Sequence, residues 1–379
     1  MPVRATKRGA ERTPFPAGTT CDVLICGASF AGLAVARELR ASRARVMVVD
    51  RYEIGERQTS ACAAPTEWLE NLGLEESIRQ TFDTIVMHTM GASRRWPLPY
   101  SFSTFDYREL CGLLWDQAGA AEFETAKVEG RTGDTVHTDR GDVSAPLIVD
   151  ALGWRRVLGT GENVQPPDAP LSRGLEVHPH GRHPDLQFWV DPRYLPSGYG
   201  WSFPAREELR IGMGSYDPRF HVKEPTVRLA EEVGADAVRY QGNWIPHRLR
   251  PATEDGTFFV GDSAGHCIPM SAEGIRTAFY FGIAAGRELA AVLAGRGTRA
   301  EALRRYHAFS AAHRWKYEWM FRNQQAVRHL HGWPLDALNR LAARPRAGHW
   351  LFGKYLNLAH PSFALPAPPA AVRSVAIAA

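Results

Sequence analysis

Lysine is scarce in this chain of 379 residues, which contains only Lys7, Lys127, Lys223, Lys316 and Lys354. Arginine therefore carries most of the positive charge, and the formal net charge is just +4. A protein that binds nucleic acid usually shows a much larger basic excess or a recognisable motif such as a zinc finger. The sequence shows neither, which argues against a nucleic-acid partner.

Cysteine is present in a pattern that excludes two kinds of site. The cysteines are odd in number and form no Cys-x-x-Cys pair: Cys21, Cys26, Cys62, Cys111 and Cys267. Neither a disulfide framework nor a structural zinc site is therefore supported, and no histidine spacing indicates metal ligands. We expect no metal ion and a reducing, cytoplasmic environment.

Long apolar segments are missing as well. No uninterrupted apolar run reaches the roughly 18 residues of a transmembrane helix, and residues 1–20 lack the apolar core of a signal peptide. We expect these first residues to form a flexible basic arm. With 44% apolar residues and a mean hydropathy of −0.29, the remaining chain can bury a large core in one big or two closely joined domains.

The first ordered part has the pattern of a βαβ unit. Residues 21–26 form an apolar strand, 30–42 have helical periodicity, and 45–49 form a second strand that ends at Asp50. Further along, helices are expected over 67–80, 106–119 and 222–234. Alternation predicts strands over 83–100, and residues 147–153 have the pattern of a buried strand that leads into a turn.

Together these elements predict an α/β fold. It consists of a discontinuous Rossmann-like nucleotide-binding domain, an inserted and mostly antiparallel β-sheet substrate domain, and a C-terminal helical region. The expected segments are 21–82, 101–165 and 250–300 for the first domain, 83–100 and 166–249 for the second, 301–363 for the helical region and 364–379 for a tail.

The sequence GASFAG, residues 27–32, stands where the first strand turns into the first helix. In a dinucleotide-binding fold this turn brings backbone N–H groups and a helix N-terminus to a pyrophosphate. Ser29 occupies the middle position, where glycine is usual. Asp50, about twenty residues further on, is the expected acceptor for a ribose hydroxyl. These residues suit NAD as well as FAD.

A second segment, residues 257–282, favours FAD. It contains a buried strand that delivers Gly261 and Asp262 to a turn, followed by a helix that begins near Gly274 and Ile275. The carboxylate suits the ribityl or pyrophosphate region, and the helix N-terminus would place partial positive charge beside a flavin ring. The turn at Gly153 is a third element of this kind. Each of these features can also be an ordinary turn, strand end or helix cap.

Two motifs in the substrate domain carry a more specific resemblance. They are GYGWSFP, residues 198–204, and the Gly212-Met213-Gly214 segment. Combined with the three nucleotide-binding elements, they resemble the FAD-dependent geranylgeranyl reductase family of p-hydroxybenzoate hydroxylase-like flavoproteins. That family typically shows a YxWxFP segment, a short spacer and GxG. The resemblance spans residues 21–286.

The resemblance implies which residues hold FAD. They are Gly27, Ser29, Phe30, Ala31, Gly32, Asp50, Arg51, Cys62, Ala63, Arg108, Val128, Gly153, Gly261, Asp262, Gly274 and Ile275. Arg108 matches an FAD-contacting arginine at the start of a helix, although alone it is a surface helix residue. Ala272 departs from the family, which usually has glycine there, and its methyl group could alter how the flavin is seated.

Cys62 stands where many family members have a cysteine near the flavin. Its thiol could donate a proton to a reacting alkene, depending on its pKa, or it could be a small buried residue. Tyr199, Trp201 and Phe203 alternate and therefore point to one face of a strand. They are candidates for the wall of an apolar substrate channel, although such a face is also ordinary sheet core.

The function implied by the resemblance is reduction of carbon-carbon double bonds in a prenyl, geranylgeranyl-type chain on a lipid, a quinone or a prenyl diphosphate. The expected partner is thus a hydrophobic small molecule or a lipid. No second Rossmann unit follows the first, so NAD(P)H, another electron donor or a separate donor protein would bind transiently. Aromatic residues over 315–321 could close the tunnel, contact the inner face of a membrane or simply pack.

Other functions stay open. The FAD architecture is shared with monooxygenases that hydroxylate aromatic or polyketide-like substrates and with halogenases. Halogenases need a lysine after the second strand and typically a WxWxIP segment. No lysine lies between Lys7 and Lys127, and Tyr199 and Phe203 occupy the divergent motif positions, so a halogenase is disfavoured. A non-enzymatic FAD-binding scaffold is a further alternative.

Overall fold

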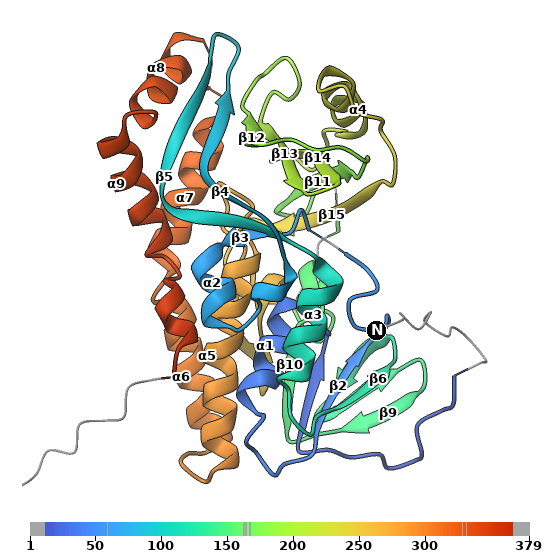
Figure 1. Ribbon diagram of the computed structural model, residues 1–379. Coiled ribbons are helices and arrows are strands. Elements are labelled where there is room, and N and C mark those ends of the chain that lie inside the picture. Colours follow the sequence, from blue (N-terminus) through green and yellow to red (C-terminus); the bar gives the residue numbers. More distant parts are fainter. Residues whose placement is uncertain are drawn as a thin grey trace, which may run out of the picture.

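The structure is a computed structural model that describes residues 12–58, 60–161, 165–166, 168–327, 329–330 and 332–366. A six-stranded sheet lies in the lower half of Figure 1 and an eight-stranded sheet in the upper half, with helices packed beside both. The predicted α/β fold is confirmed. Most of the predicted N-terminal arm and of the predicted tail, residues 1–11 and 367–379, lies outside the described residues.

The six-stranded sheet is built from short strands in the order β16, β17, β10, β1, β2, β6. Their bounds, in that order, are Thr253–Glu254, Thr257–Phe259, Leu147–Asp150, Val23–Cys26, Val46–Asp50 and Glu122–Thr125. Neighbouring strands run parallel except β16, which pairs antiparallel with β17. Strands β1 and β10 are buried throughout, as expected of a parallel sheet covered by helices. The carboxyl ends of the parallel strands meet at one edge.

Helix α1 (Phe30–Glu38) packs against helix α5 (Ile275–Leu293), and α3 (Tyr107–Asp116) lies beside α1 (Figure 1). The α1–α5 contact is very close, because a Cβ added at Gly282 would lie only 2.7 Å from the Ala31 carbonyl oxygen. It joins elements that are far apart in the sequence. As a result, the N-terminus of α5 reaches the same edge of the sheet as the N-terminus of α1.

The eight-stranded sheet has the order β15, β11, β14, β13, β12, β4, β5, β3. In that order the strands span Gln241–Pro246, Leu171–Val177, Glu208–Ser215, Gly198–Ala205, Leu186–Trp189, Ile78–His88, Ser93–Phe105 and Ala63–Pro65. The β12–β4 pair is parallel and the other pairs are antiparallel. Helix α4 (Lys223–Glu232) packs on β14 and β11 over a second, smaller core.

The remaining elements flank the two sheets. A three-stranded sheet contains β7 (Val128–Thr132), β8 (Thr135–Thr138) and β9 (Gly141–Ser144). The C-terminal region is helical, as predicted, with α6 (Arg299–Ala311), α7 (Arg314–Val327), α8 (Trp333–Ala342) and α9 (Pro345–Leu356). Helix α9 runs along β5, on the left of Figure 1, and α6 packs on α5.

The helix predicted over 67–80 is wrong in its second half. Helix α2 spans only Thr66–Asn71, and the Gly73 N–H closes it by donating to the Glu70 carbonyl at 2.9 Å. A 3₁₀ helix, Glu75–Ser77, follows, and the chain then enters β4. There Ile78 pairs with Phe105. Pairing with a distant strand overrides the local helix propensity of the polar sequence.

The inserted sheet is larger than the predicted segment 83–100. Strand β4 begins at Ile78 and β5 ends at Phe105. Strand β3, which lies within the predicted nucleotide-binding segment, also pairs with β5. Pairing between the two strands extends past the two prolines of β5 to Phe105 and back to Ile78 on β4. The local pattern missed both ends because these contacts join residues that are distant in the sequence. The division of the chain into domains stays a prediction.

Replacing Gly282 by alanine should destabilise the protein, whereas the same change at Gly112 should not. A Cβ at 282 would press on the backbone of α1, and such overpacking typically costs about 1–3 kcal/mol. Gly112 lies within α3 with nothing within 4 Å of an added Cβ, so alanine there should be neutral or stabilise by up to about 1 kcal/mol. Urea unfolding followed by circular dichroism measures both. Equal effects of the two changes would contradict the close α1–α5 contact.

Candidate functional site

A cavity of about 1930 Å³ lies between the carboxyl edge of the six-stranded sheet and one face of the eight-stranded sheet. Its lining comes from the turns after β1, β2 and β17, from the segment before β3, from β11, β13 and β15, and from helices α7, α8 and α9. Pockets for one drug-sized ligand usually measure about 300–1,000 Å³. The cavity can therefore hold a dinucleotide together with a second ligand.

Nearly all residues predicted for the site line this cavity. They are Ser29, Phe30, Ala31, Asp50, Arg51, Cys62, Ala63, Val128, Gly153, Tyr199, Trp201, Phe203, Gly261, Asp262, Gly274 and Ile275. The fold thus brings together residues from seven separate stretches of the sequence, namely 29–31, 50–51, 62–63, 128, 153, 199–203 and 261–275. Gly27, Gly32 and Arg108 lie outside the lining.

Gly27 and Gly32 shape the turn between β1 and α1 from behind. Gly27 has a φ of +113°, and a Cβ added there would overlap the Ala151 carbonyl oxygen. A Cβ at Gly32 would overlap the Gly27 carbonyl oxygen. Close backbone packing therefore requires glycine at both positions. At the middle position, the Ser29 hydroxyl is compatible with the turn and accepts a hydrogen bond from the Tyr107 hydroxyl at 3.1 Å.

Arg108 does not face the cavity. Its side chain is exposed on α3, and its backbone packs against Gly55. Gly55 belongs to the loop after β2, which does line the cavity. The contact between Arg108 and FAD that the resemblance implies stays a prediction.

Asp50 ends β2 with both carboxylate oxygens hydrogen-bonded to the backbone. Oδ2 accepts from the Ala28 N–H at 2.8 Å, and Oδ1 accepts from the Tyr52 N–H at 3.0 Å. Burial raises the pKa of Asp50, and these hydrogen bonds oppose the rise. Each carboxylate oxygen can accept more than one hydrogen bond. Asp50 can therefore fix the turn and still accept a bond from a ribose hydroxyl.

Asp262 lies in the 3₁₀ helix Gly261–Ala264, directly after β17. This turn is held from behind, because the Ser263 hydroxyl donates to Asp150 Oδ1 at 2.6 Å. The other oxygen of Asp150 accepts from the Leu158 N–H at 2.8 Å. Burial raises the pKa of Asp262 to about 6, and the charge of Arg250 partly offsets that rise. A partly buried carboxyl group is thus presented to the cavity by a firmly held turn.

The loop that precedes α5 presents the N-terminus of that helix to the cavity. Ala272 in this loop has a φ of +51°, in the left-handed region that favours glycine. A glycine would adopt this conformation without strain, whereas alanine carries a cost of roughly 1–2 kcal/mol. Tyr199 and Tyr216 hold the loop, since their hydroxyls donate to the carbonyl oxygens of Ser271 and Met270 respectively.

Tyr199, Trp201 and Phe203 on β13 form an aromatic wall. Their ring centroids are 5.9 Å apart for the first pair and 6.5 Å for the second, and all three side chains are half-buried against the cavity. Gly212 on β14 makes room for the indole, because a Cβ there would overlap the Trp201 ring. The predicted alternation is therefore present, and its aromatic face borders a cavity rather than filled core.

Cys62 is fully buried in the segment before β3 and has a φ of +56°. Its Sγ donates to the Ser60 carbonyl oxygen at 3.1 Å. Burial raises the pKa of the Cys62 thiol well above its usual value, and the charge of Arg210 only partly opposes this. At neutral pH Cys62 is therefore a thiol that holds its proton, and it is not a thiolate nucleophile.

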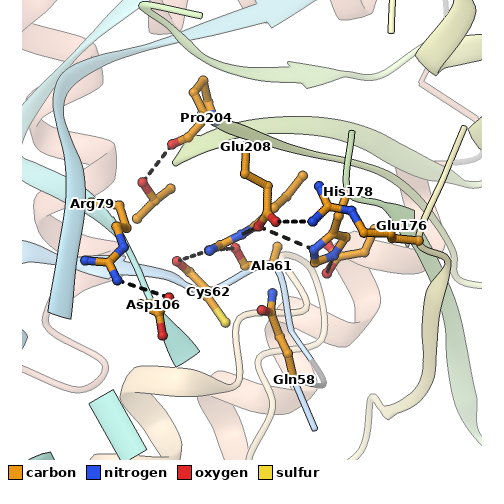
Figure 2. A network of polar contacts seen from close by, with 12 residues as sticks. Gln58, Ala61, Cys62, Arg79, Asp106, Glu176, His178, Pro204 and Glu208 are labelled. Atoms are coloured by element: carbon orange, nitrogen blue, oxygen red, sulfur yellow. Dashed lines mark hydrogen bonds and ion pairs between the residues drawn. The ribbon is translucent and has the colours of Figure 1, made fainter. Parts of the chain in front are cut away.

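Sequence reasoning missed a cluster of charged residues beside Cys62, shown in Figure 2. Glu176 lies on β11 and His178 directly after it, and Glu208 and Arg210 lie on β14. Glu176, His178 and Arg210 are buried. Isolated charged residues inside predicted strands were the signal that could have found them.

The arrangement fits a dinucleotide that carries a ring system. The N-terminus of α1 suits phosphates, and the N-terminus of α5 suits a ring that becomes negatively charged. Asp50 and Asp262 supply acceptors for hydroxyl groups, while Arg51 and Lys127 add positive charge to the lining. Among the residues that the structure describes, no group of histidine, cysteine and carboxylate side chains could hold a metal ion.

Comparison with known proteins gives partial sequence matches, and no family model matches the chain. The chain is 36% identical over 104 residues to a geranylgeranyl diphosphate reductase of Rhodobacter capsulatus, which covers 26% of each protein. It is 27% identical over 202 residues to a digeranylgeranylglycerophospholipid reductase of Methanopyrus kandleri, covering 47% of this chain and 49% of that protein. This chain resembles the geranylgeranyl reductases. The matches span from a quarter to half of the length of these curated relatives.

Solved structures share the fold over most of the chain. A geranylgeranyl bacteriochlorophyll reductase-like protein of Thermoplasma acidophilum has a TM-score of 0.77 at 17% identity and covers 91% of this chain and 98% of its own. A probable FAD-dependent monooxygenase of Pseudomonas aeruginosa has a TM-score of 0.61 at 18% identity, covering 89% and 100%. The fold is thus common to reductases and monooxygenases, and the sequence matches favour the geranylgeranyl reductases.

Replacing Asp262 by asparagine should remove a pH-dependent part of the stability of the cofactor-free protein. In the folded chain Asp262 has a pKa of about 6 instead of 3.8, so the folded state binds more protons than the unfolded state between these values. For this group the free energy of unfolding therefore falls as the pH rises through that window, and it is constant above the window.

Thermal unfolding of the two proteins between about pH 5 and pH 7.5 measures this effect. The Tm of D262N relative to that of the unchanged protein should be highest at the upper pH and should decline as the pH falls. Ionisations elsewhere cancel in the difference between the two proteins. A difference in Tm that does not vary with pH would contradict the raised pKa.

Proposed function

We propose that the chain is an FAD-dependent oxidoreductase that reduces carbon-carbon double bonds of a prenyl, geranylgeranyl-type chain. The observation that carries this proposal is that the nucleotide-binding turns and the aromatic wall share one cavity. Partial sequence matches to reductases named for a prenyl diphosphate and for a glycerophospholipid support the prenyl chain as substrate. The head group could belong to a lipid, a quinone or a diphosphate.

FAD would be held by the two helix N-termini and the two carboxylates between them. Backbone N–H groups in the first turn of α1 would bind the pyrophosphate. Asp50 would accept from a ribose hydroxyl, and Asp262 from the ribityl chain. The partial positive charge at the N-terminus of α5 would stabilise negative charge on the reduced ring. When bound and reduced, FAD supplies a hydride.

Reduction of an alkene also consumes a proton, and Cys62 is proposed as its source. Its thiol is protonated at neutral pH because burial raises the pKa, and the residue lines the cavity. The positive charge of Arg210 would stabilise the thiolate that is left behind. The aromatic wall would bind the prenyl chain and exclude water from it. A water molecule is the alternative source of the proton.

Electrons must reach the flavin from outside the chain. We propose that NAD(P)H or another donor, including a separate donor protein, binds transiently. The residues assigned to FAD lie along the carboxyl edge of the six-stranded sheet. FAD would therefore occupy the place where a nicotinamide cofactor could otherwise bind permanently, which supports transient binding of the donor.

A monooxygenase that hydroxylates an aromatic or polyketide-like substrate is the second candidate. The observation that favours it is the fold shared with an anhydrotetracycline hydroxylase of Streptomyces rimosus, which has a TM-score of 0.62 at 19% identity. Such an enzyme would consume oxygen together with NAD(P)H, and only when its substrate is present.

An anaerobic assay separates the two candidates. FAD-loaded protein, reduced with dithionite, is incubated with geranylgeranyl diphosphate and with a geranylgeranylated glycerophospholipid, and the products are weighed by mass spectrometry. A prenyl reductase yields products heavier by two hydrogen atoms for each bond reduced. Unchanged prenyl substrates in this assay, combined with substrate-dependent oxygen uptake in a separate aerobic assay with NAD(P)H and aromatic substrates, would overturn the reductase proposal.

Replacing Cys62 by alanine should slow prenyl reduction much more than it weakens flavin binding, because alanine keeps most of the small side chain and removes only the thiol. A positioned proton donor typically contributes roughly 10²–10⁴-fold to the rate, so kcat should decrease by a factor in that range. The rate at which the substrate reoxidises the reduced flavin measures this decrease. Cys111, which is also fully buried but lies on α3, supplies the matched control C111A. An unchanged kcat in C62A would assign the proton to water.

The C-terminal helices carry an exposed apolar surface that is continuous with the cavity. Trp315 and Trp319 on α7 and Trp350 on α9 are 68%, 59% and 66% exposed, and all three also line the cavity. Residues 312–360 contain eight arginines and lysines against two acidic residues. Exposed tryptophans combined with positive charge are typical of surfaces that lie on anionic bilayers.

We therefore propose that this surface binds peripherally to the inner, cytoplasmic face of a membrane and that a lipid substrate enters the cavity there. In the part of the chain that the structure describes, no helix is both long and apolar enough to span a bilayer. Attachment would thus depend on the tryptophans and the basic residues. Each basic residue near an anionic surface contributes about 1 kcal/mol.

The double change of Trp315 and Trp350 to serine should weaken binding to phosphatidylglycerol-containing vesicles by about tenfold or more, because each indole contributes part of the roughly 1.5–3 kcal/mol of a buried large side chain. Co-sedimentation measures the binding, with phosphatidylcholine vesicles as the uncharged comparison. Tyr240, which is exposed before β15, supplies the control Y240S. Failure of the unchanged protein to bind anionic vesicles would contradict the proposed attachment.

A further inference from the structure

A chain of charged side chains links the neighbouring strands β11 and β14 beside the segment that carries Cys62 (Figure 2). Its members alternate in sign along the order Glu176, His178, Glu208 and Arg210. His178 Nε2 lies 2.9 Å from Glu176 Oε1, and His178 Nδ1 lies 3.4 Å from Glu208 Oε1. Arg210 Nε donates to the same Glu208 oxygen at 3.0 Å.

His178 and Glu208 are both ionised at neutral pH. Burial opposes the charge on His178, but its hydrogen bonds to Glu176 and Glu208 raise its pKa to about 9. Burial likewise opposes the charge on Glu208, but His178 and Arg210 lower its pKa to about 2. Forming a buried ion pair costs free energy because both charges lose their hydration. Removing one partner costs free energy as well, because the other charge is then left buried and unpaired. The cluster therefore holds Arg210 in a fixed place.

The guanidinium of Arg210 also donates hydrogen bonds to backbone carbonyls at and next to Cys62, the proposed proton donor. Nη1 donates to the carbonyl oxygens of Ala61 at 3.0 Å, Cys62 at 3.3 Å and Phe105 at 2.9 Å. The Arg210 side chain is almost completely buried. One guanidinium thus joins the Cys62 segment to the end of β5. A lysine ammonium lacks the planar fork that spans a carboxylate and carbonyls in this way.

The Cys62 backbone needs such a restraint. Its φ of +56° lies in the left-handed region, which costs a non-glycine residue roughly 1–3 kcal/mol and persists only where the surroundings enforce it. The Phe105 N–H donates to the Cys62 carbonyl at 3.0 Å, and Arg210 adds the second bond to that oxygen. Without Arg210, the segment would be free to relax and carry the thiol to another place.

The other end of the charged chain reaches the aromatic wall. Glu176 Oε2 accepts from Trp201 Nε1 at 3.1 Å, and Glu176 Oε1 accepts from the Gln241 amide at 2.9 Å. The indole of Trp201 and the Cys62 segment are therefore fixed by the same buried set of charges. The distance between the substrate wall and the thiol is set by that connection.

We propose that Arg210 is a positioning residue that, held by Glu208, keeps Cys62 in its left-handed backbone conformation, with the thiol buried at the wall of the cavity. This inference rests on the proposed function where it concerns turnover, but the placement of Cys62 is measurable without turnover. The decisive variant is Arg210→Lys, which keeps a positive charge beside Glu208 and removes the planar guanidinium that binds the carboxylate and the carbonyls together.

Arg140 supplies the matched control. It makes the same kind of contact outside the cavity lining, with Nη1 2.7 Å from Glu124 Oε2 and 2.8 Å from the Thr125 carbonyl oxygen, and with Nε donating to the Thr13 carbonyl at 2.8 Å. Arg140→Lys therefore shows how much stability the protein loses when lysine replaces any partly buried guanidinium of this kind. Glu208→Gln is the milder second variant, used if Arg210→Lys does not fold.

The first readout is labelling of the folded protein by iodoacetamide, with each cysteine quantified by peptide mass spectrometry. All five cysteines are buried, so the other four serve as internal references. In R210K, Cys62 should react at least about tenfold faster than in the unchanged protein, while Cys26 and Cys111 should not change. R140K should leave all five rates unchanged, and E208Q should give an intermediate increase at Cys62.

The second readout is turnover of a prenyl substrate. A misplacement of about 1 Å at a reacting group costs roughly 10²-fold, so R210K should lower kcat by about that factor while KM changes by less than about threefold. Absence of turnover in every protein, the unchanged one included, would refute the proposed function and leave the labelling result intact. Labelling of Cys62 at the unchanged rate in both R210K and E208Q would refute the positioning role.

Discussion

The close packing of α1 on α5 is the constraint on which the rest of the site depends. Gly282 allows the two helix backbones to approach until an added Cβ would touch the Ala31 carbonyl. The turn that contains Ser29 and the helix start at Gly274 consequently face one cavity. If the helices lay further apart, one dinucleotide could not contact both N-termini. The hydrogen bond from Ser263 to Asp150 fixes the neighbouring turn in the same way.

The loop before α5 connects the nucleotide half of the cavity to its substrate half. Its backbone carbonyls accept from Tyr199 on β13 and Tyr216 after β14, and the Ser271 hydroxyl bonds the Tyr355 hydroxyl of α9 at 2.6 Å. The aromatic wall therefore has two tasks, because Tyr199 both lines the cavity and restrains the loop. The strained conformation of Ala272 is held in place by these surrounding contacts.

Local patterns could predict the elements whose geometry depends on near neighbours in the sequence. The β1–α1 turn and Asp50 at the end of β2 follow from the order of strand, turn, helix and strand. The helix expected over 67–80 failed because Ile78 pairs with Phe105, a contact that no local pattern contains. The cluster around Glu176 and Arg210 was missed for the same reason, since it joins residues of β11 to residues of β14, two strands that are distant in the sequence.

The sequence by itself determined the α/β fold, the nucleotide-binding turns and the alternating aromatic face, because backbone conformation and side-chain periodicity follow from residues close together in the chain. Only the tertiary structure decided that Cys62 is a fully buried thiol beside Arg210, that Arg108 lies outside the cavity lining, and that exposed tryptophans line part of the cavity. Burial, pKa and hydrogen-bond partners depend on contacts between segments distant in sequence. Those contacts exist only once the chain has folded.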